Sequence, residues 1–427
     1  MADDARACAL DLLDSVLRRR QTVDAASAGH GGLARLPGAE QAFAGRLTLT
    51  AIRRLGQIDD LIARALEKPL PAKALIAQDV LRLGAAQLLF MEIPAHAAVD
   101  TSVDLFRRRG AGGFAKLVNA VLRRLAREGA AWTASQDAPR LNTPDWLWQS
   151  WCDAYGEECA HAIASAHLAE APLDITPKAD VAGWAERLGG RVVAGGTVRL
   201  DQPGAVSGLA GYDAGAWWVQ DAAARLVGAL LGDVRGKRVI DICAAPGGKT
   251  ALLGAAGAQV TAVDRSAQRL VRLRANLQRL GLEAEVIEAD AGNWQPAEPA
   301  DAVLLDAPCS ATGTLRRHPD VALGKSADDV RRLAALQARL FRHAATMVKP
   351  GGVLVYATCS LQPEEGPAVV TRAADFEPPL SPLPIAASEV GGLDEWLTPE
   401  GHFRSLPCHL AGEGGLDGFF AARFRRA

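Results

Sequence analysis

One short stretch, RVIDICAAPGGKT at residues 238–250, restricts the possible fold more than any other part of the chain. Val239, Ile240 and Ile242 are β-branched residues that suit a buried strand, and a Pro-Gly-Gly turn and an Ala/Leu-rich helical segment follow them. Such a strand, turn and helix lets a ligand approach bare backbone while the N–H groups of the helix N-terminus point at its polar end. The stretch therefore predicts an α/β fold with a ligand at the turn.

Three ligands use this geometry: a nucleotide phosphate, a dinucleotide and the amino-acid end of S-adenosylmethionine. A phosphate-binding loop would need glycine at position 243, where the chain has Cys243, and the dinucleotide pattern G-x-G-x-x-G is missing. The spacing thus argues against the first two ligands. A plain glycine turn in an α/β core is the alternative, so the interpretation needs support from residues downstream.

Composition bounds the class of protein. The 427 residues suffice for two or three domains, and 49% hydrophobic with 22% charged residues is typical of globular proteins. No run of 18 apolar residues occurs and the N-terminal segment lacks the pattern of a signal peptide, so we expect a cytoplasmic protein without a membrane partner. Seven cysteines without C-x-x-C spacing predict reduced thiols, with neither a disulfide framework nor a metal site.

The first 135 residues differ from the rest in charge and pattern. They hold 19 Lys and Arg against 14 Asp and Glu, whereas the remainder holds 28 against 35. Apolar residues recur at helical spacing in 5–19, 43–66, 74–91 and 114–127. We therefore predict an all-α domain over 1–135 that meets RNA, although a solvated helical surface gives the same charge. The arginines at 107–109 either end a helix or bind RNA phosphates.

A linker and a small α+β subdomain are expected over 136–204. Residues 130–144 are polar, contain proline and lack periodicity, which is typical of a linker. The pattern that follows predicts a helix over 145–170, a strand at 173–176, a helix over 180–188 and two strands around the glycines at 195 and 196.

The remaining residues, 205–427, alternate strand and helix patterns, which predicts a doubly wound, mainly parallel sheet. The expected strands after the opening motif are 258–264, 284–290, 301–310, 351–360 and 418–424. Asp264, Asp290 and Asp306 each end an apolar run, so we expect their carboxylates at the sheet edge where ligands bind. A single such residue is usually a helix cap, but three in succession favour a site. Cys309 and Cys359 end strands at the same edge, where a thiol can act as a nucleophile.

These motifs carry a family resemblance. DICAAPGGKT, LDAPCSATG, YATCSLQPEEG and LDGFFAARFRR resemble the RNA cytosine-carbon-5 methyltransferases of the Rsm/Nop/Sun type. QDVLRLGAAQLLFMEIPAHAAV and KLVNAVLRRL resemble the NusB-like RNA-binding domain of the bacterial members that act on 16S ribosomal RNA. The resemblance implies a Rossmann-like methyltransferase domain after an all-α NusB-like domain and the small α+β element. It also implies S-adenosylmethionine as cofactor and 16S ribosomal RNA, not DNA, as partner; a monomer is favoured.

The same resemblance implies roles for individual residues. Asp264 would bind the ribose hydroxyls, with Arg269 at a further cofactor position; Asp290 would lie by the adenine, and Asp306 near the transferred methyl group and the cytosine. The methionine end of the cofactor would lie on the turn residues Cys243, Ala244, Ala245, Pro246, Gly247, Gly248 and Lys249.

The chemistry agrees with these roles. Carbon 5 of cytosine is a poor nucleophile, so an enzyme adds a thiolate at carbon 6 to activate it. Chemistry alone leaves open which cysteine attacks, because a Pro-Cys motif supplies the nucleophile in DNA cytosine methyltransferases. The resemblance to the RNA enzymes implies that Cys359 attacks and that Cys309 assists product release. This chain has Ala311 where relatives usually have glycine, a change that tightens the loop after Cys309.

Two other functions fit parts of the sequence. The same chemistry on transfer RNA is disfavoured because transfer-RNA members usually lack the NusB-like half. A non-catalytic RNA-binding or antitermination factor is disfavoured because both cysteines and all three carboxylates are present.

Overall fold

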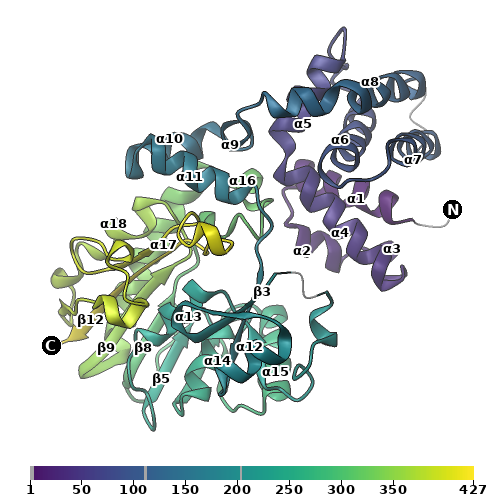
Figure 1. The fold of residues 1–427 in the computed structure, drawn as a ribbon. Helices are drawn as coiled ribbons and strands as arrows, with labels where there is room; N and C mark the ends of the chain where they lie inside the picture. The colour runs from purple at the N-terminus through teal and green to yellow at the C-terminus, as the bar shows by residue number, and fades with distance from the viewer. Residues whose placement is uncertain (1–3, 110–112, 202–203) are drawn as a thin grey trace. The chain divides into compact units, whose positions relative to one another are not determined.

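The computed structural model describes residues 4–109, 113–201 and 204–427, which form two compact units (Figure 1). The first, here called the helical unit, comprises Met1–Ala169 and Leu315–Lys325. The second, the sheet unit, comprises Glu170–Thr314 and Ser326–Ala427. The domain limits expected from the sequence, after residues 135 and 204, stay predictions.

The helical unit contains no strand among its described residues, as its apolar periodicity predicted. Its helices are α1 Ala5–Arg19, α2 Val23–Ala28, α3 Gly31–Ala34, α4 Gly38–Arg53, α5 Leu55–Ala65, α6 Leu75–Phe90, α7 Ala95–Arg108, α8 Ala115–Ala134, α9 Ala138–Leu141, α10 Asp145–Tyr155, α11 Glu157–His167 and α16 Val321–Gly324. Leu12, Leu61 and Leu122 are fully buried members of its core. Gly84 lets α6 approach α8 closely, because an added Cβ would lie 2.6 Å from Leu122 Cδ2.

Three expectations for this unit need correction. The single helix expected over 43–66 breaks at Arg54, which has φ −107° and ψ 16° between α4 and α5. The helix expected over 145–170 breaks at Gly156, which has φ 83° between α10 and α11. The linker expected over 130–144 is partly helical, because α8 continues through Trp132, which packs on the core, and α9 follows.

The three arginines at 107–109 have acidic partners within the unit. Arg107 pairs with Asp104 at 3.1 Å, and Arg108 pairs with Asp4. Arg109 donates to Asp11 at 2.7 Å. These contacts at the end of α7 favour the helix-terminus interpretation over phosphate binding for this run.

The sheet unit begins with a small antiparallel sheet in the order β2-β3-β1-β4. Its elements are β1 Leu173–Pro177, α12 Val181–Leu188, β2 Arg191–Val193, β3 Thr197–Leu200 and β4 Trp217–Val219. The strands and the helix expected over 173–200 are therefore present. Arg199 and Asp174 are completely buried and form an ion pair at 2.7 Å that joins β3 to β1.

The larger sheet has the order β10-β12-β9-β8-β5-β6-β7, with β11 paired to β12. Strands β5 to β9 are parallel, and β12 runs antiparallel to β9, so the predicted mainly parallel sheet is confirmed. The elements are α13 Ala222–Ala229, β5 Arg238–Ile242, α14 Gly248–Ala255, β6 Gln259–Asp264, α15 Ala267–Leu280, β7 Glu285–Glu288, β8 Ala300–Asp306, α17 Ala327–Met347, β9 Val348–Thr358, α18 Pro367–Val370, β10 Leu380–Pro382, β11 Phe403–Ser405 and β12 Phe419–Arg426.

Successive residues of the buried strands face two different cores, which makes the unit three-layered (Figure 1). Ile240 of β5 packs in one core with Phe341 of α17. Val239 packs in the other with Leu226 of α13. The hydrophobic strand pattern is therefore explained by burial on both faces, which leaves the strand ends as the place for a ligand site. No described helix is long and apolar enough to cross a membrane.

Candidate active site at the carboxyl edge of the parallel sheet

The turn between β5 and α14 is held in place by the neighbouring strand β6. Ala244 N donates to Val263 O at 3.1 Å, and Ala245 N donates to Asp264 Oδ2 at 3.1 Å. Gly247 has φ 102°, a left-handed conformation that side chains disfavour. Cys243 adopts the same region with φ 63°. The turn is thus fixed in shape before any ligand arrives.

A cavity of about 270 Å³ lies at this edge and brings the predicted carboxylates together. It is lined by Cys243, Asp264, Arg265, Arg269, Asp290, Ala291, Asp306, Ala307, Pro308, Cys309, Ala311, Leu336, Arg339, Leu340 and Cys359. Asp264 and Asp306 are the last residues of β6 and β8. The strand expected over 284–290 ends earlier, at Glu288, so Asp290 lies two residues beyond it in the following loop.

Backbone N–H groups orient the carboxylate of Asp264, which is only 3% exposed. Its Oδ1 accepts from Ser266 N at 2.9 Å, and its Oδ2 accepts from Ala245 N. Arg269 donates to Oδ2 at 3.3 Å and also to Ala245 O. Arg269 therefore links α15 to the glycine turn as well as to Asp264.

Asp290 is more exposed and makes local contacts typical of a turn. Its Oδ1 accepts from Gly292 N at 2.9 Å, and Asn293 Nδ2 donates to its Oδ2 at 3.4 Å. It lines the same cavity as Asp264. Asp290 therefore lines the candidate site, and its carboxylate also accepts hydrogen bonds from the turn that follows it.

Lys249 and Asp306 form an ion pair inside the site. Lys249 Nζ donates to Asp306 Oδ2 at 2.7 Å and lies 5.0 Å from the centroid of the Phe419 ring. Burial lowers the pKa of Lys249, but Asp306, Cys359 and Asp241 together outweigh burial and raise it overall. The Lys249 ammonium group is therefore a cation at the carboxyl edge of the sheet, and it is paired with Asp306.

Burial raises the pKa of two further groups of the opening motif. Burial raises the pKa of Cys243 to about 12, with Asp306 and Asp264 acting in the same direction. Burial also raises the pKa of Asp241 to about 7. Thr250 Oγ1 donates to Asp241 Oδ2 at 2.6 Å, while Oδ1 has no partner among the described residues. Cys243 is therefore unsuited to act as a nucleophile.

The thiols of Cys309 and Cys359 lie in contact, with 3.4 Å between the two sulfur atoms. The hydrogen bond with Cys359 and burial raise the pKa of Cys309 well above its usual range, and the charge of Glu365 adds to the effect. A backbone hydrogen bond from Ala311 opposes it. Because the pKa of Cys309 is raised, we take Cys359 as the candidate nucleophile of the pair.

Several residues at the site were missed in the sequence. Arg265 and Arg339 line the cavity, and neither makes an ion pair or hydrogen bond with another described residue. Glu365 is fully buried behind the two cysteines, whereas the preceding Glu364 is exposed. Nothing in the motif QPEEG distinguishes one glutamate from the other. Arg265 had one available signal, its position directly after Asp264.

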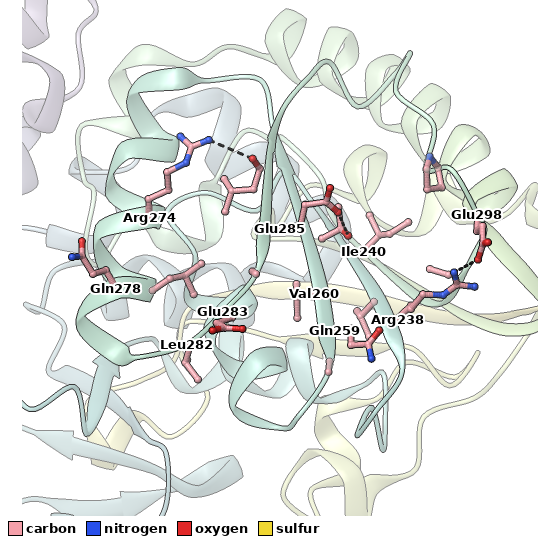
Figure 2. Close-up of a pocket in the computed structure, with 18 residues that line it drawn as sticks. Arg238, Ile240, Gln259, Val260, Arg274, Gln278, Leu282, Glu283, Glu285 and Glu298 are labelled. Atoms are coloured by element: carbon pink, nitrogen blue, oxygen red, sulfur yellow. Dashed lines mark hydrogen bonds and ion pairs between the residues drawn. The ribbon is translucent and has the colours of Figure 1, made fainter.

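A larger cavity of about 990 Å³ lies where β5 and β6 begin, and it contains none of the predicted site residues (Figure 2). Arg238 pairs there with Glu298, and Arg274 of α15 donates to Val286 O at 3.4 Å. Ligands of parallel sheets bind at the carboxyl ends of the strands. The smaller cavity beside Cys359 is therefore the candidate active site.

Comparison with known proteins gives matches for both parts of the chain. Residues 229–425 match the family described as "16S rRNA methyltransferase RsmB/F", and residues 3–127 match the NusB family. Ribosomal RNA small subunit methyltransferase B of Shewanella oneidensis is 34% identical over 91% of this chain and 92% of its own length. The protein of that name from Pseudomonas putida is 39% identical over 86% of each chain. The crystal structure of PH0851 shares the fold, with a TM-score of 0.75 and 22% identity over the whole of both chains.

Proposed function

Because the chain belongs to the 16S rRNA methyltransferase RsmB/F family, we propose that it transfers a methyl group to carbon 5 of a cytidine in 16S ribosomal RNA. The family predicted from the motifs is confirmed, together with the NusB-like and methyltransferase folds. S-adenosylmethionine is the methyl donor, as predicted. The target carbon, the covalent intermediate and the choice of 16S RNA are the proposed parts.

The observation that carries the proposal is the contact of the two thiols at the wall of the cavity. Cys309 and Cys359 lie 3.4 Å apart in the same cavity as Asp264, Asp290 and Asp306. Methyl transfer to an oxygen or an exocyclic nitrogen needs no cysteine. A protonated thiol beside a second thiol supports chemistry in which one sulfur bonds to the base and the other assists its release.

The proposed reaction follows from this arrangement. The target base leaves its stack, and Cys359 Sγ forms a bond to carbon 6, so that the electron pair of the 5,6 double bond makes carbon 5 nucleophilic. Bound S-adenosylmethionine supplies an electrophilic methyl group. After carbon 5 has taken the methyl group, water accepts the proton of carbon 5, which restores the double bond and expels Cys359 Sγ as a thiolate. We infer that Cys309 assists this elimination and that Asp306, paired with Lys249, lies near the transferred methyl group.

The residues of the cavity fit the donor. The carboxylate of Asp264 accepts two backbone hydrogen bonds, which favour its charged form, and a charged carboxylate suits the paired hydroxyls of a ribose. The first N–H groups of α14 have no acceptor within the helix and suit the carboxylate of the methionine end. We therefore assign the turn 243–249, Asp264, Arg269 and Asp290 to the donor. Seven free thiols suit a reducing compartment, so the proposed location is the cytoplasm.

The test is bisulfite sequencing of ribosomal and transfer RNA from a strain that lacks the gene. We expect one cytidine of 16S RNA to lose its methyl group, wild-type protein to restore it, and Cys359→Ser to fail to restore it. Loss of a mark in transfer RNA alone would assign the substrate to transfer RNA. An unchanged map in every RNA would contradict the enzymatic proposal.

A further inference from the structure

A single buried carboxylate, that of Glu365, lies behind both cysteines. It belongs to the short turn Pro363–Glu365 and has no exposed surface. Its Oε1 accepts from Ser310 N at 2.8 Å and from Gln337 Nε2 at 3.0 Å. Its Oε2 accepts from Ser360 Oγ at 2.6 Å and from Ser310 Oγ. Four donors are what a buried carboxylate needs to replace its water.

The donors belong to the residues that directly follow the two thiols. Ser310 follows Cys309, and Ser360 follows Cys359, and their hydroxyl oxygens lie 3.0 Å apart. The loops are also joined by Gly313 N, which donates to Cys359 O at 2.9 Å. Because one carboxylate holds both serines, neither cysteine can move without disturbing the contacts of the other.

Neighbouring elements hold Glu365 itself. Tyr356 of β9 donates its hydroxyl to Glu365 O at 2.7 Å. Gln337 of α17, besides its bond to the carboxylate, donates to Pro308 O at 2.9 Å. Contacts with the core of the sheet unit therefore fix the position of Glu365. Its carboxylate in turn fixes Ser310 and Ser360, the residues that follow the two cysteines.

We propose that Glu365 is a positioning residue whose carboxylate fixes the spacing of the Cys309 and Cys359 thiols and thereby determines which of them attacks. The importance of that choice rests on the proposed function. The negative charge of Glu365 also helps to raise the pKa of Cys309. Glutamine is a poor replacement for Glu365. Its one side-chain oxygen can accept from only two of the four donors, and its NH₂ group, itself a donor, would face the other two.

Other charged and titratable groups face the pair and are retained in the test variants. Lys249 of α14, which is paired with Asp306 of β8, interacts electrostatically with Cys359, and Tyr356 of β9 interacts with Cys309. Arg404 of β11 donates to Ser360 O at 2.7 Å. A change seen on replacing Glu365 alone can therefore be assigned to its carboxylate.

The test compares Glu365→Gln with Glu364→Gln, a matched change at the adjacent exposed residue, in the full-length protein. Each is treated with iodoacetamide across a pH series, and alkylation of Cys309 and Cys359 is followed by mass spectrometry. Alkylation reports the thiolate, so wild type and Glu364→Gln should react first at Cys359. In Glu365→Gln the preference for Cys359 should fall about tenfold, which corresponds to one pKa unit between the thiols. Its kcat should fall while its affinity for S-adenosylmethionine is unchanged.

An unchanged preference and pH profile in a folded Glu365→Gln protein would overturn the proposal. If that variant does not fold, the double variant Ser310→Ala and Ser360→Ala removes the two hydroxyl donors and keeps the carboxylate. It should also lose the preference, and a wild-type preference there would overturn the proposal. Alkylation needs neither RNA nor cofactor. Selective alkylation in a wild-type protein that methylates no RNA would therefore refute the proposed function and leave this inference standing.

Discussion

The two cysteines of the site differ in their surroundings although both follow a strand of the same sheet. The hydrogen bond to Cys359, burial and the charge of Glu365 all raise the pKa of Cys309. Cys359 lies beside the cation of Lys249. The sequence motifs alone allowed either order of attack, and the contacts around each thiol favour attack by Cys359.

Serine variants of the two cysteines should therefore fail in different ways. Cys359→Ser should abolish methylation, because a hydroxyl is a far weaker nucleophile near neutral pH. Cys309→Ser should still attack and methylate but release product slowly, so that a covalent protein–RNA species accumulates on denaturing gels. The trapped species in Cys359→Ser, and its absence from Cys309→Ser, would reverse the two roles.

Ala311 shows how a small departure in a motif acts on the backbone. Its φ is 59°, a left-handed conformation that costs an L-residue roughly 1–2 kcal/mol. Glycine relieves that strain but loses more chain entropy on folding, about 0.5–1 kcal/mol. Ala311→Gly should thus stabilise the protein by up to about 1 kcal/mol and raise Tm by roughly 1–3 °C.

The control is the same substitution at Ala338, an exposed position inside α17. Ala338→Gly should lower stability by about 1 kcal/mol, because glycine is unfavourable within a helix. Thermal unfolding measures both variants. A decrease in Tm for Ala311→Gly equal to that of Ala338→Gly would show that the backbone of the loop carries no strain.

At the scale of elements, the sequence predicted those parts whose pattern is local. The runs that became β5, β6, β8 and β9 are apolar and bounded by glycine, proline or aspartate, so their strands could be read directly. The break between α4 and α5 could not, because apolar periodicity continues across Arg54 while the chain turns. The predicted strand end at Asp290 is wrong by two residues, because the apolar Ala289 continues the strand pattern past the last strand residue, Glu288.

The end of β6 allows a test of the donor site. Asp264→Asn keeps the size of the side chain and one acceptor oxygen for the turn, but removes the charge proposed to bind the ribose hydroxyls. We expect the affinity for S-adenosylmethionine, measured by calorimetry, to weaken by about 1.5–3 kcal/mol. Glu288→Gln, at the exposed end of β7 and outside the cavity, should bind as wild type does. Equal affinities for the two variants would exclude Asp264 from the donor site.

At the scale of the whole molecule, the order of the chain does not follow the two units. Residues 315–325 directly follow the loop of Cys309 in sequence, yet they belong to the helical unit. Arg53 Nη1 donates to Arg316 O at 2.7 Å, and Val23 N donates to Asp320 Oδ2 at 3.1 Å. These contacts join residues 263 and 297 positions apart, and no periodicity or motif in the sequence could have predicted them.

Charge is also distributed differently from what the composition suggested. Residues 136–427 carry an excess of acidic residues, yet Arg265 and Arg339 at the cavity lack an acidic partner among the described residues. Arginines without an acidic partner at the wall of the candidate active site suit the phosphates of the proposed RNA substrate. We therefore expect the acidic sheet unit to contact RNA through these two arginines, despite its net negative charge.

RNA binding by the full-length protein should show this contact through its salt dependence. Each phosphate contact on single-stranded RNA contributes about 0.7 to the slope of log affinity against log salt concentration. Arg265→Ala and Arg339→Ala should each lower the slope by about that amount and leave the affinity for S-adenosylmethionine unchanged. Arg342→Ala is the control, because Arg342 lies one turn further along α17, 5.3 Å from the centroid of the Phe376 ring and outside the cavity. A loss of cofactor affinity with an unchanged salt slope would assign the two arginines to the donor site instead.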